Sequence, residues 1–485
     1  MKTRLALLLC AVGASCYAQT PGTFAATGNM ITGRFWHTST LLADGRVLIA
    51  GGYTNGRPSF GQAPTAAAEL YDPASGTFTT TGNMTSARAY HTATLLPDGR
   101  VLIAAGSGGQ PPSAQGTGPE YSLVSAELYD PSTGIFTATG DMTTSSIVGT
   151  NTATLLPGGR VLITGVPFTA DLYDPGAGTF TATGNMTSPP PFATATLLAD
   201  GRVLFASYSG AALYDSRPGM FSITGTQAGF ESQATLLTNG KVLVAGGNDD
   251  SGPDTLAEVY DPSTGIFTGT GKMTAPRGDF TATLLPDGKS LITGGSSWIG
   301  LGTSVMYYSC CLSSAELYDT LTGLFTSTGG MTAGRAGHTA TLLKSGNVLI
   351  AGGAGDSGVP VTAEIYHPVT PIAAPALLSL SGDGQGQGAI QHANTVRIAS
   401  ADDPAVAGEY LSIYLTGLLD GSVIPPQIAI GGRPAEITFF GAVPGYPGLD
   451  VINIRMPSGV TPGPAVPVRL NYLGRSSNQV NIGAQ

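Results

Sequence analysis

The chain has 485 residues, including 70 glycines and 34 prolines; only 11% of its residues are charged, and its mean hydropathy is +0.16. This composition is typical of a folded, β-rich chain with many turns and argues against disorder, and the length allows more than one domain. The formal charge of −10 and the pI near 4.9 argue against nucleic acid or an anionic membrane as the main partner, because both select basic surfaces.

Residues 1–18 are predicted to be an export signal of the bacterial type. Two basic residues precede a short apolar run at 5–12, and small residues follow up to a cleavage point after Ala18. Lipid attachment at Cys16 is the alternative, but Gly13 stands where such a signal prefers a large aliphatic residue. The apolar run is too short to anchor a bilayer span, so we expect a secreted or cell-surface protein without membrane insertion.

The stretch HTATLLPDGRVLIAAG, residues 91–106, sets the pattern for most of the chain. Its two apolar runs are joined by Pro-Asp-Gly, and Asp-Gly between such runs is a strong β-hairpin signal. A variable loop follows, then a strand that ends in Tyr-Asp-Pro or a relative, then a fourth strand such as GTFTTTGNM. Each repeat therefore predicts four short strands. The text occurs seven times, with equivalent leucines at Leu41, Leu95, Leu155, Leu197, Leu236, Leu284 and Leu342.

The spacing of the repeats and the two ends of the series predict a closed ring. Equivalent leucines are between 39 residues (Leu197 to Leu236) and 60 residues (Leu95 to Leu155) apart, which is the period of propeller blades. Fourth-strand text already appears at residues 22–30, whereas the last repeat stops at residues 366–368 without it. We expect the amino-terminal strand to complete the seventh blade, which hides the sheet edges of an open ring.

Three features of these repeats resemble kelch repeats, most closely the central propeller of the galactose oxidase family. They are the Gly-Gly doublets after the second strand, the Arg-x-x-His sequence at the start of the first strand, and the AELYDP text of the third strand. The resemblance covers residues 22–369. It implies an all-β, seven-bladed kelch-type propeller for this range.

The text changes after residue 369. Residues 370–390 are predicted to be a linker, and residues 391–485 contain strand-like runs that Pro and Gly interrupt at the spacing of a sandwich. The segments GGRPAEITFFG and PSGVTPGPAVPVRL resemble the small Ig-like carboxyl-terminal module of secreted bacterial repeat proteins, a family without established chemistry. We expect an Ig-like β-sandwich there.

The galactose oxidase resemblance implies a copper radical site of two histidines, two tyrosines and a cysteine bonded to one of the tyrosines. The chain has five histidines, and His37, His91 and His338 share one repeat position, which favours a structural role. Their convergence on a metal near the ring axis is the alternative. The acidic loop 248–254 matches no calcium-loop template. We therefore expect no metal and no other cofactor.

Cys310 and Cys311 lie in the long loop of the sixth repeat, together with Trp298, Tyr307 and Tyr308. Two adjacent thiols in an exported protein tend to oxidise, so the pair is a candidate disulfide. One interpretation is a rigid aromatic knob that binds ligand, and the other is a staple of the loop.

Four arginines head the first strands of repeats one, two, six and seven, which are neighbours once the ring closes. Strand geometry puts the variable loops on the same face. Such an arc on an acidic protein can hold carboxylates through forked hydrogen bonds, and it resembles the way kelch adaptors hold acidic peptides. The alternative is pairing with recurrent glutamates between blades. The arginines are Arg34, Arg88, Arg277 and Arg335, and the glutamates are Glu69, Glu127, Glu316 and Glu364.

The sequence thus favours a monomeric, non-catalytic protein that binds a glycan or an acidic peptide or protein with its loop face. The arginines and the three loop aromatics are the candidate ligand-binding residues, and no catalytic residue is assigned. The alternative is a carbohydrate-active enzyme, an oxidase or a lyase, on the same scaffold. A cluster of perturbed acids, bases or metal ligands on that face favours the enzyme, whereas arginines, aromatics and loop polar groups favour the binding protein.

Overall fold

The structure is a computed structural model that contains β-strands and no helix in the residues it describes. Within those residues, no helix is long and apolar enough to cross a membrane. The described residues are 22–485 except 55–63, 109–121, 145–150, 166–168, 185–193, 208–209, 226–232, 250–251, 299–307, 356–357, 370–374, 383, 419–424, 444–448 and 473–474. The predicted export signal therefore lies outside the described residues.

Seven four-stranded antiparallel sheets make up most of the described chain up to residue 367, and each takes the name of its first strand. The first three are β2 (Thr38–Leu41), β3 (Val47–Ala50), β4 (Ala68–Asp72), β5 (Thr77–Thr80); β6 (Thr92–Leu95), β7 (Val101–Ala104), β8 (Ala126–Asp130), β9 (Ile135–Ala138); and β10 (Thr152–Leu155), β11 (Val161–Gly165), β12 (Thr169–Asp174), β13 (Thr179–Ala182). The next three are β14 (Thr194–Leu197), β15 (Val203–Ser207), β16 (Gly210–Asp215), β17 (Met220–Thr224); β18 (Gln233–Leu236), β19 (Val242–Ala245), β22 (Ala257–Asp261), β23 (Ile266–Gly269); and β24 (Thr281–Leu284), β25 (Ser290–Thr293), β28 (Ala315–Asp319), β29 (Leu324–Ser327).

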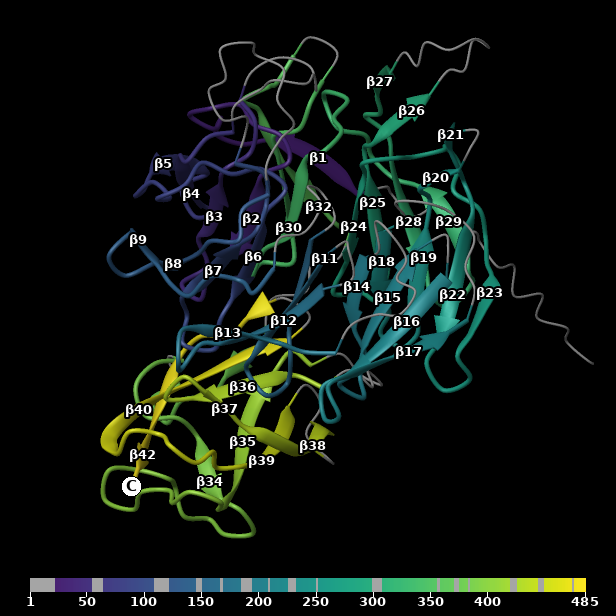
Figure 1. The fold of residues 1–485 in the computed structure, drawn as a ribbon. Coiled ribbons are helices and arrows are strands. Elements are labelled where there is room, and N and C mark those ends of the chain that lie inside the picture. Colours follow the sequence, from purple (N-terminus) through teal and green to yellow (C-terminus); the bar gives the residue numbers. More distant parts are fainter. Residues whose placement is uncertain are drawn as a thin grey trace, which may run out of the picture.

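The last sheet joins the two ends of the repeat series. It contains β30 (Thr339–Leu342), β31 (Val348–Ala351), β32 (Ala363–His367) and, from the amino terminus, β1 (Thr23–Ala26). Thr23 pairs with His367 and Ala26 with Glu364, so the predicted pairing of these two segments is confirmed. The first strands contact one another in the order β2, β6, β10, β14, β18, β24 and β30, and β30 contacts β2 again. The sheets thus form a closed circle, an arrangement that fits a β-propeller (Figure 1).

The Asp-Gly turns fix the hairpin between the first and second strands. Gly99 has a φ of 92°, which favours glycine, and its amide donates to the Leu96 carbonyl at 2.9 Å. The Asp98 carboxylate accepts a hydrogen bond from the Arg100 amide at 3.0 Å. The turn is therefore held by its own residues, as the sequence predicts.

The second strands are buried and mostly apolar because neighbouring sheets cover both of their faces. In β3, Val47 and Ile49 pack with residues of the β30 sheet, whereas Leu48 and Ala50 pack with residues of the β6 sheet. Side chains of a strand alternate between its faces, so a strand buried on both sides needs a continuous apolar run. The repeated VLIA text is the sequence signature of this position.

A tyrosine and a threonine link every sheet to the one before it in the described ring. The Tyr71 hydroxyl in β4 is 2.8 Å from the hydroxyl of Thr27, which follows β1 in the β30 sheet, so this link also closes the ring. The other six pairs span 2.8–3.1 Å and are Tyr129 with Thr81, Tyr173 with Thr139, Tyr214 with Thr183, Tyr260 with Thr224, Tyr318 with Thr270, and Tyr366 with Thr328.

The strands from residue 376 onwards form two sheets that share one hydrophobic core. Ala376 pairs with Thr416, so part of the range predicted to be linker belongs to the first of these sheets. The first sheet holds β33 (Ala376–Leu377), β34 (Ile390–His392), β35 (Tyr410–Thr416), β38 (Glu436–Ala442) and β39 (Asp450–Arg455). The second holds β36 (Gln427–Ile430), β37 (Arg433–Pro434), β40 (Gly463–Tyr472), β41 (Arg475–Ser476) and β42 (Val480–Ala484).

This carboxyl-terminal unit contacts the hairpin-turn face of the ring, opposite the variable loops. Arg469 Nη1 donates to the Asp98 carbonyl at 3.1 Å. Lys344 Nζ, in the last repeat, donates to the carbonyl of Ala43 in the first repeat at 2.6 Å and to that of Ser477 in the carboxyl-terminal unit at 3.3 Å. This lysine therefore joins the unit to the first and last repeats. Figure 1 shows the unit, in green to yellow, at one end of the molecule and the small loop strands β26 (Ser296–Trp298) and β27 (Tyr308–Cys311) at the other.

A glycine-to-alanine pair tests how closely neighbouring sheets approach. A Cβ at Gly82 would lie 2.2 Å from the Gly134 carbonyl oxygen of the next sheet, whereas a Cβ at Gly269 meets nothing within 4 Å. We expect Gly82→Ala to lower the free energy of unfolding by about 1–3 kcal/mol, because backbone must move. Gly269→Ala is the matched control. Equal stability of both variants in urea unfolding would contradict this packing.

Candidate functional site

The four arginines lie inside the sheets and not on a ligand-facing surface. Each has 0% of its side chain exposed. Arg34 Nη2 is 2.6 Å from Glu69 Oε1 in the same sheet, and Arg34 Nη1 donates to the carbonyls of Gly51 and Ala67 at 2.9 and 2.8 Å. Burial lowers the pKa of Arg34, and the Glu69 carboxylate partly offsets this effect. The equivalent ion pairs are Arg88 with Glu127 (2.8 Å), Arg277 with Glu316 (2.8 Å) and Arg335 with Glu364 (2.7 Å).

These ion pairs fix the segment that enters the first strand in four of the repeats. Besides Arg34, the Glu69 carboxylate accepts hydrogen bonds from the amides of Ile31 at 2.7 Å and Thr32 at 3.1 Å. The interpretation of the arginines as a ligand-binding arc is therefore corrected to the alternative, pairing with the recurrent glutamates. The pairing also differs in one respect from that alternative, because each arginine and its glutamate belong to the same repeat.

The three histidines at the recurrent position are buried structural residues. His91 Nε2 is 2.9 Å from the Thr38 hydroxyl of the preceding sheet, and His37 and His338 make equivalent contacts to Thr339 and Thr281. Burial lowers the pKa of His91 and of His338 to about 3, and the nearby arginines add to this effect. Among the described residues, no group of three His, Cys, Asp or Glu side chains is placed to hold a metal ion.

The loop of the sixth repeat forms a short hairpin of β26 (Ser296–Trp298) and β27 (Tyr308–Cys311), in which Trp298 pairs with Tyr308. Tyr307 lies outside the described residues. Cys311 is a free thiol in the structure, and the side chain of Cys310 lies outside the described residues, so the disulfide between them stays a prediction. The Cys311 thiol donates to the carbonyl of Ala354, which follows β31 in the last repeat, at 2.9 Å, and burial raises the pKa of this thiol. This contact corresponds to the staple interpretation of the loop.

An aromatic cluster that the sequence interpretation missed lies where the first strands begin. Trp36 and Tyr90 stack with ring centroids 4.3 Å apart and an interplanar angle of 28°, and both are half-buried. Phe35 and Tyr53 pack beneath them and are buried. We call the Trp36–Tyr90 stack the aromatic platform.

Backbone hydrogen bonds connect the two residues of the aromatic platform with two further residues in a series that runs around the ring axis. The Tyr90 amide donates to the Trp36 carbonyl, the Trp36 amide to the Gly337 carbonyl, and the Gly337 amide to the Asp279 carbonyl, each at 3.0 Å. All four residues have a positive φ, between 50° and 61°. For the three residues other than glycine this conformation is uncommon and persists only where surrounding contacts hold it.

These four residues share one position of the repeat, the one before His or Phe in Arg-x-x-His. A Cβ at Gly337 would lie 2.9 Å from Trp36 Nε1, so glycine leaves room for the indole ring. The signal for the site was the variation at this position, Trp36, Tyr90, Asp279 and Gly337, within otherwise constant text. The described bridges Phe35 to Tyr53 and Ala89 to Ser107 confirm that the starts of first strands and the variable loops share a face.

Comparison with known proteins gives a relative for part of the chain. Galactose oxidase from Gibberella zeae is 31% identical over 146 residues, which are 30% of this chain and 20% of the relative. The chain carries a galactose-oxidase-like propeller. A solved structure of a fungal alcohol oxidase of the AA5 family in complex with copper matches 96% of this chain and 100% of its own, with a TM-score of 0.61 and 18% identity, which shows the fold alone. No family model matches the chain.

The described residues do not fit the copper radical site that the resemblance to galactose oxidase implies. Tyr90 and His91 are adjacent, but the His91 ring is buried and bonded to Thr38. The described thiol, that of Cys311, donates a hydrogen bond to a backbone carbonyl. We therefore assign no chemical step to copper here.

Removing one arginine tests the structural role of the ion pairs. Arg88→Ala leaves the buried Glu127 carboxylate without its cation, so we expect a loss of about 3–5 kcal/mol in the free energy of unfolding. Arg46→Ala is the control, because the Arg46–Asp44 pair is exposed and such pairs contribute about 1 kcal/mol or less. Unchanged stability of Arg88→Ala would return the arginines to the list of ligand-binding candidates.

The buried histidines predict a loss of stability in acid. An unfolded histidine binds a proton near pH 6.5, whereas His338 in the folded chain does so only near pH 3. Stability is therefore complete above pH 6.5 and falls as the pH drops towards 3, by up to about 1.4 kcal/mol per pH unit for each such histidine.

The free energy of unfolding of His338→Phe, measured in urea at several pH values, should depend less steeply on pH by the contribution of one histidine. Phenylalanine fits, because Phe280 occupies the equivalent place against Gly246, as His338 does against Gly294. His367→Phe, at an exposed position of β32, is the matched control. An unchanged slope in His338→Phe would contradict the neutral, buried ring.

Proposed function

We propose that the protein is a carbohydrate-active enzyme on a galactose-oxidase-like scaffold, with its sugar substrate bound on the aromatic platform. The observation that carries this proposal is the half-exposed stack of Trp36 on Tyr90, held near the ring axis on the loop face. Binding sites for small ligands combine aromatic surfaces with a few placed polar groups, and the platform has Asp279 on the same backbone chain.

The platform suits a sugar for physical reasons. A flat aromatic ring offers a large apolar face to the C–H groups of a sugar ring, and the hydroxyl of Tyr90 supplies a polar end. Gly337 keeps the indole of Trp36 in place by leaving its Cβ position empty. The buried arginines no longer support an acidic peptide as the ligand, so the glycan remains as the proposed partner.

A second candidate is glycan binding without turnover. It is favoured by the absence, among the described side chains, of a metal-binding group of three His, Cys, Asp or Glu residues. The relationship to galactose oxidase favours the enzyme, although the match spans only 20% of that relative.

The wider architecture belongs to the same proposal. We infer a seven-bladed kelch-type propeller at residues 22–369 and an Ig-like carboxyl-terminal module, on the support of the closed circle of sheets and the separate core. Export through residues 1–18 and a monomeric state are also proposed, the first from the sequence pattern alone.

Glycan binding and turnover can be measured with one set of variants. We expect Trp36→Ala to weaken binding of a galactoside panel by about tenfold or more in calorimetry, because the stacking face is lost. Trp36→Phe should retain most of the binding, and Tyr410→Ala, exposed on the carboxyl-terminal unit, is the control.

The same samples are assayed for hydrogen peroxide release from sugars and primary alcohols, with and without added copper, and for unsaturated products of uronate polysaccharides. Turnover that Trp36→Ala lowers supports the enzyme, and binding without turnover supports the second candidate. Neither binding nor turnover with any carbohydrate would overturn the proposal.

A further inference from the structure

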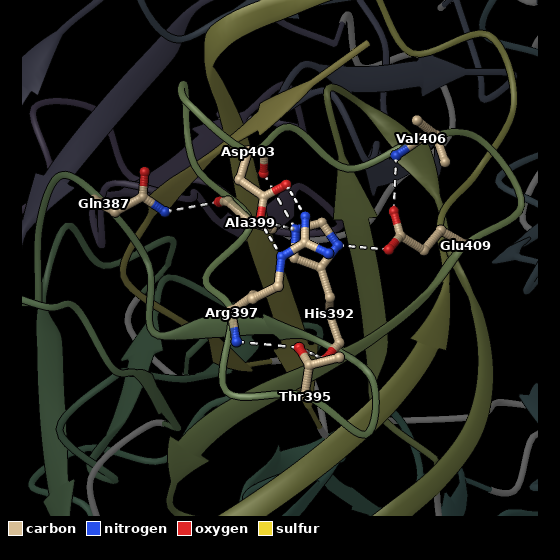
Figure 2. Close-up of polar contacts among 8 residues, drawn as sticks. All are labelled: Gln387, His392, Thr395, Arg397, Ala399, Asp403, Val406 and Glu409. Carbon is tan, nitrogen blue, oxygen red and sulfur yellow. Dashed lines mark hydrogen bonds and ion pairs between the residues drawn. The ribbon is translucent and has the colours of Figure 1, made fainter.

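A histidine in the carboxyl-terminal unit lies among charged side chains far from the aromatic platform. His392 ends β34, and its side chain is 6% exposed. Its Nδ1 is 2.5 Å from Glu409 Oε1, and its Nε2 is 3.2 Å from the backbone oxygen of Asp403 and 3.5 Å from the Asp403 carboxylate. Figure 2 shows the ring between these two residues.

Both ring nitrogens of His392 therefore face groups that only accept hydrogen bonds. A neutral imidazole donates from one nitrogen, whereas an imidazolium donates from both. The charge count agrees, because the groups that face the ring are two carboxylates, Asp403 and Glu409, and one guanidinium, Arg397, which pairs with Asp403 at 2.7 Å. A protonated His392 makes this set neutral.

The loop that His392 holds also holds the end of the chain. Asp403 and Glu409 lie within residues 400–409, and Glu409 Oε2 accepts a hydrogen bond from the Val406 amide at 3.0 Å. Ala405 in the same loop is buried in the core, and its amide donates to the Gly483 carbonyl at 3.0 Å. The Gln485 amide in turn donates to the Ala405 carbonyl at 3.0 Å.

We propose that His392 is a pH-sensitive latch. Its imidazolium holds the loop 400–409 against β42, and loss of its proton releases the loop and the end of the chain that pairs with it. After deprotonation, one ring nitrogen of His392 presents a lone pair to a group that also only accepts hydrogen bonds. The carboxylates of Asp403 and Glu409 are then left with Arg397 as their single cation. Repulsion then favours opening of the loop, and opening removes the two backbone hydrogen bonds of Ala405. This latch does not depend on the proposed enzymatic function.

Hydrogen exchange of the full chain at two pH values tests the latch. The reporters are the amides of Ala405 and Gln485, and the reference is the Ile413 amide in the core strand β35. Histidine is the side chain that ordinarily changes charge between about pH 5 and about pH 8. We expect the protection factors of the reporters, corrected for intrinsic exchange, to fall by about tenfold or more over this range while Ile413 stays protected.

Variants separate the latch from a general effect of pH. His392→Gln should give low reporter protection at both pH values, and Glu409→Gln should reduce the pH dependence because it removes one of the two carboxylates. His367→Gln, on the other unit, should behave like the wild type. Equal protection at both pH values in the wild type, or the same fall in His392→Gln, would overturn the proposal.

A direct measurement remains if His392→Gln does not fold. The ring nitrogen signals of His392 in the wild-type chain show its protonation state by NMR. A neutral ring at about pH 5 would overturn the latch, and two ring N–H groups at that pH would support it.

Discussion

Each second strand in the seven described sheets is buried on both faces, so no sheet of this ring is complete without its neighbours. Val47 and Ile49 need one neighbour and Leu48 the other, and burial of such side chains stabilises by about 1.5–3 kcal/mol each. The polar links between sheets sit at the rim of this apolar packing, where the tyrosine hydroxyl of one sheet meets a threonine of the previous one. The ring is therefore the cooperative unit, and individual sheets are not.

The aromatic platform follows directly on segments that the buried ion pairs fix. Arg34 and Glu69 fix the segment that leads into β2, and Trp36 follows two residues after that arginine. A buried ion pair is a costly way to stabilise a fold, since desolvation offsets most of its attraction. Here the Arg34–Glu69 pair has a second consequence: it fixes the backbone that leads to Trp36, which has a conformation that this residue rarely adopts.

The repeats made the arrangement of strands predictable, because the Asp-Gly turn, the VLIA run and the Tyr-Asp-Pro strand each have a single physical explanation. The role of Arg34 was harder, because a guanidinium that binds ligand and one that binds Glu69 leave the same sequence pattern. Recurrence of both residues in the same repeats was the signal for the ion pair.

Trp36 was missed for the opposite reason. Residues that recur in the repeats identify the scaffold, whereas the aromatic platform lies at a repeat position where the residue type varies. The contact of Cys311 could not be predicted for a third reason. Its hydrogen bond to Ala354 joins two repeats, and no spacing within either repeat predicts it.

The closing strand has a consequence for how the protein is made. Thr23 pairs with His367, so β1 leaves the ribosome long before its partner strand, which lies 344 residues later. At ordinary rates of synthesis this wait lasts on the order of tens of seconds. During that time β1 lacks its partner β32, so the ring closes only after synthesis has passed the last repeat. The ring of this chain therefore stays incompletely folded until β32 has been synthesised, however stable the individual sheets are.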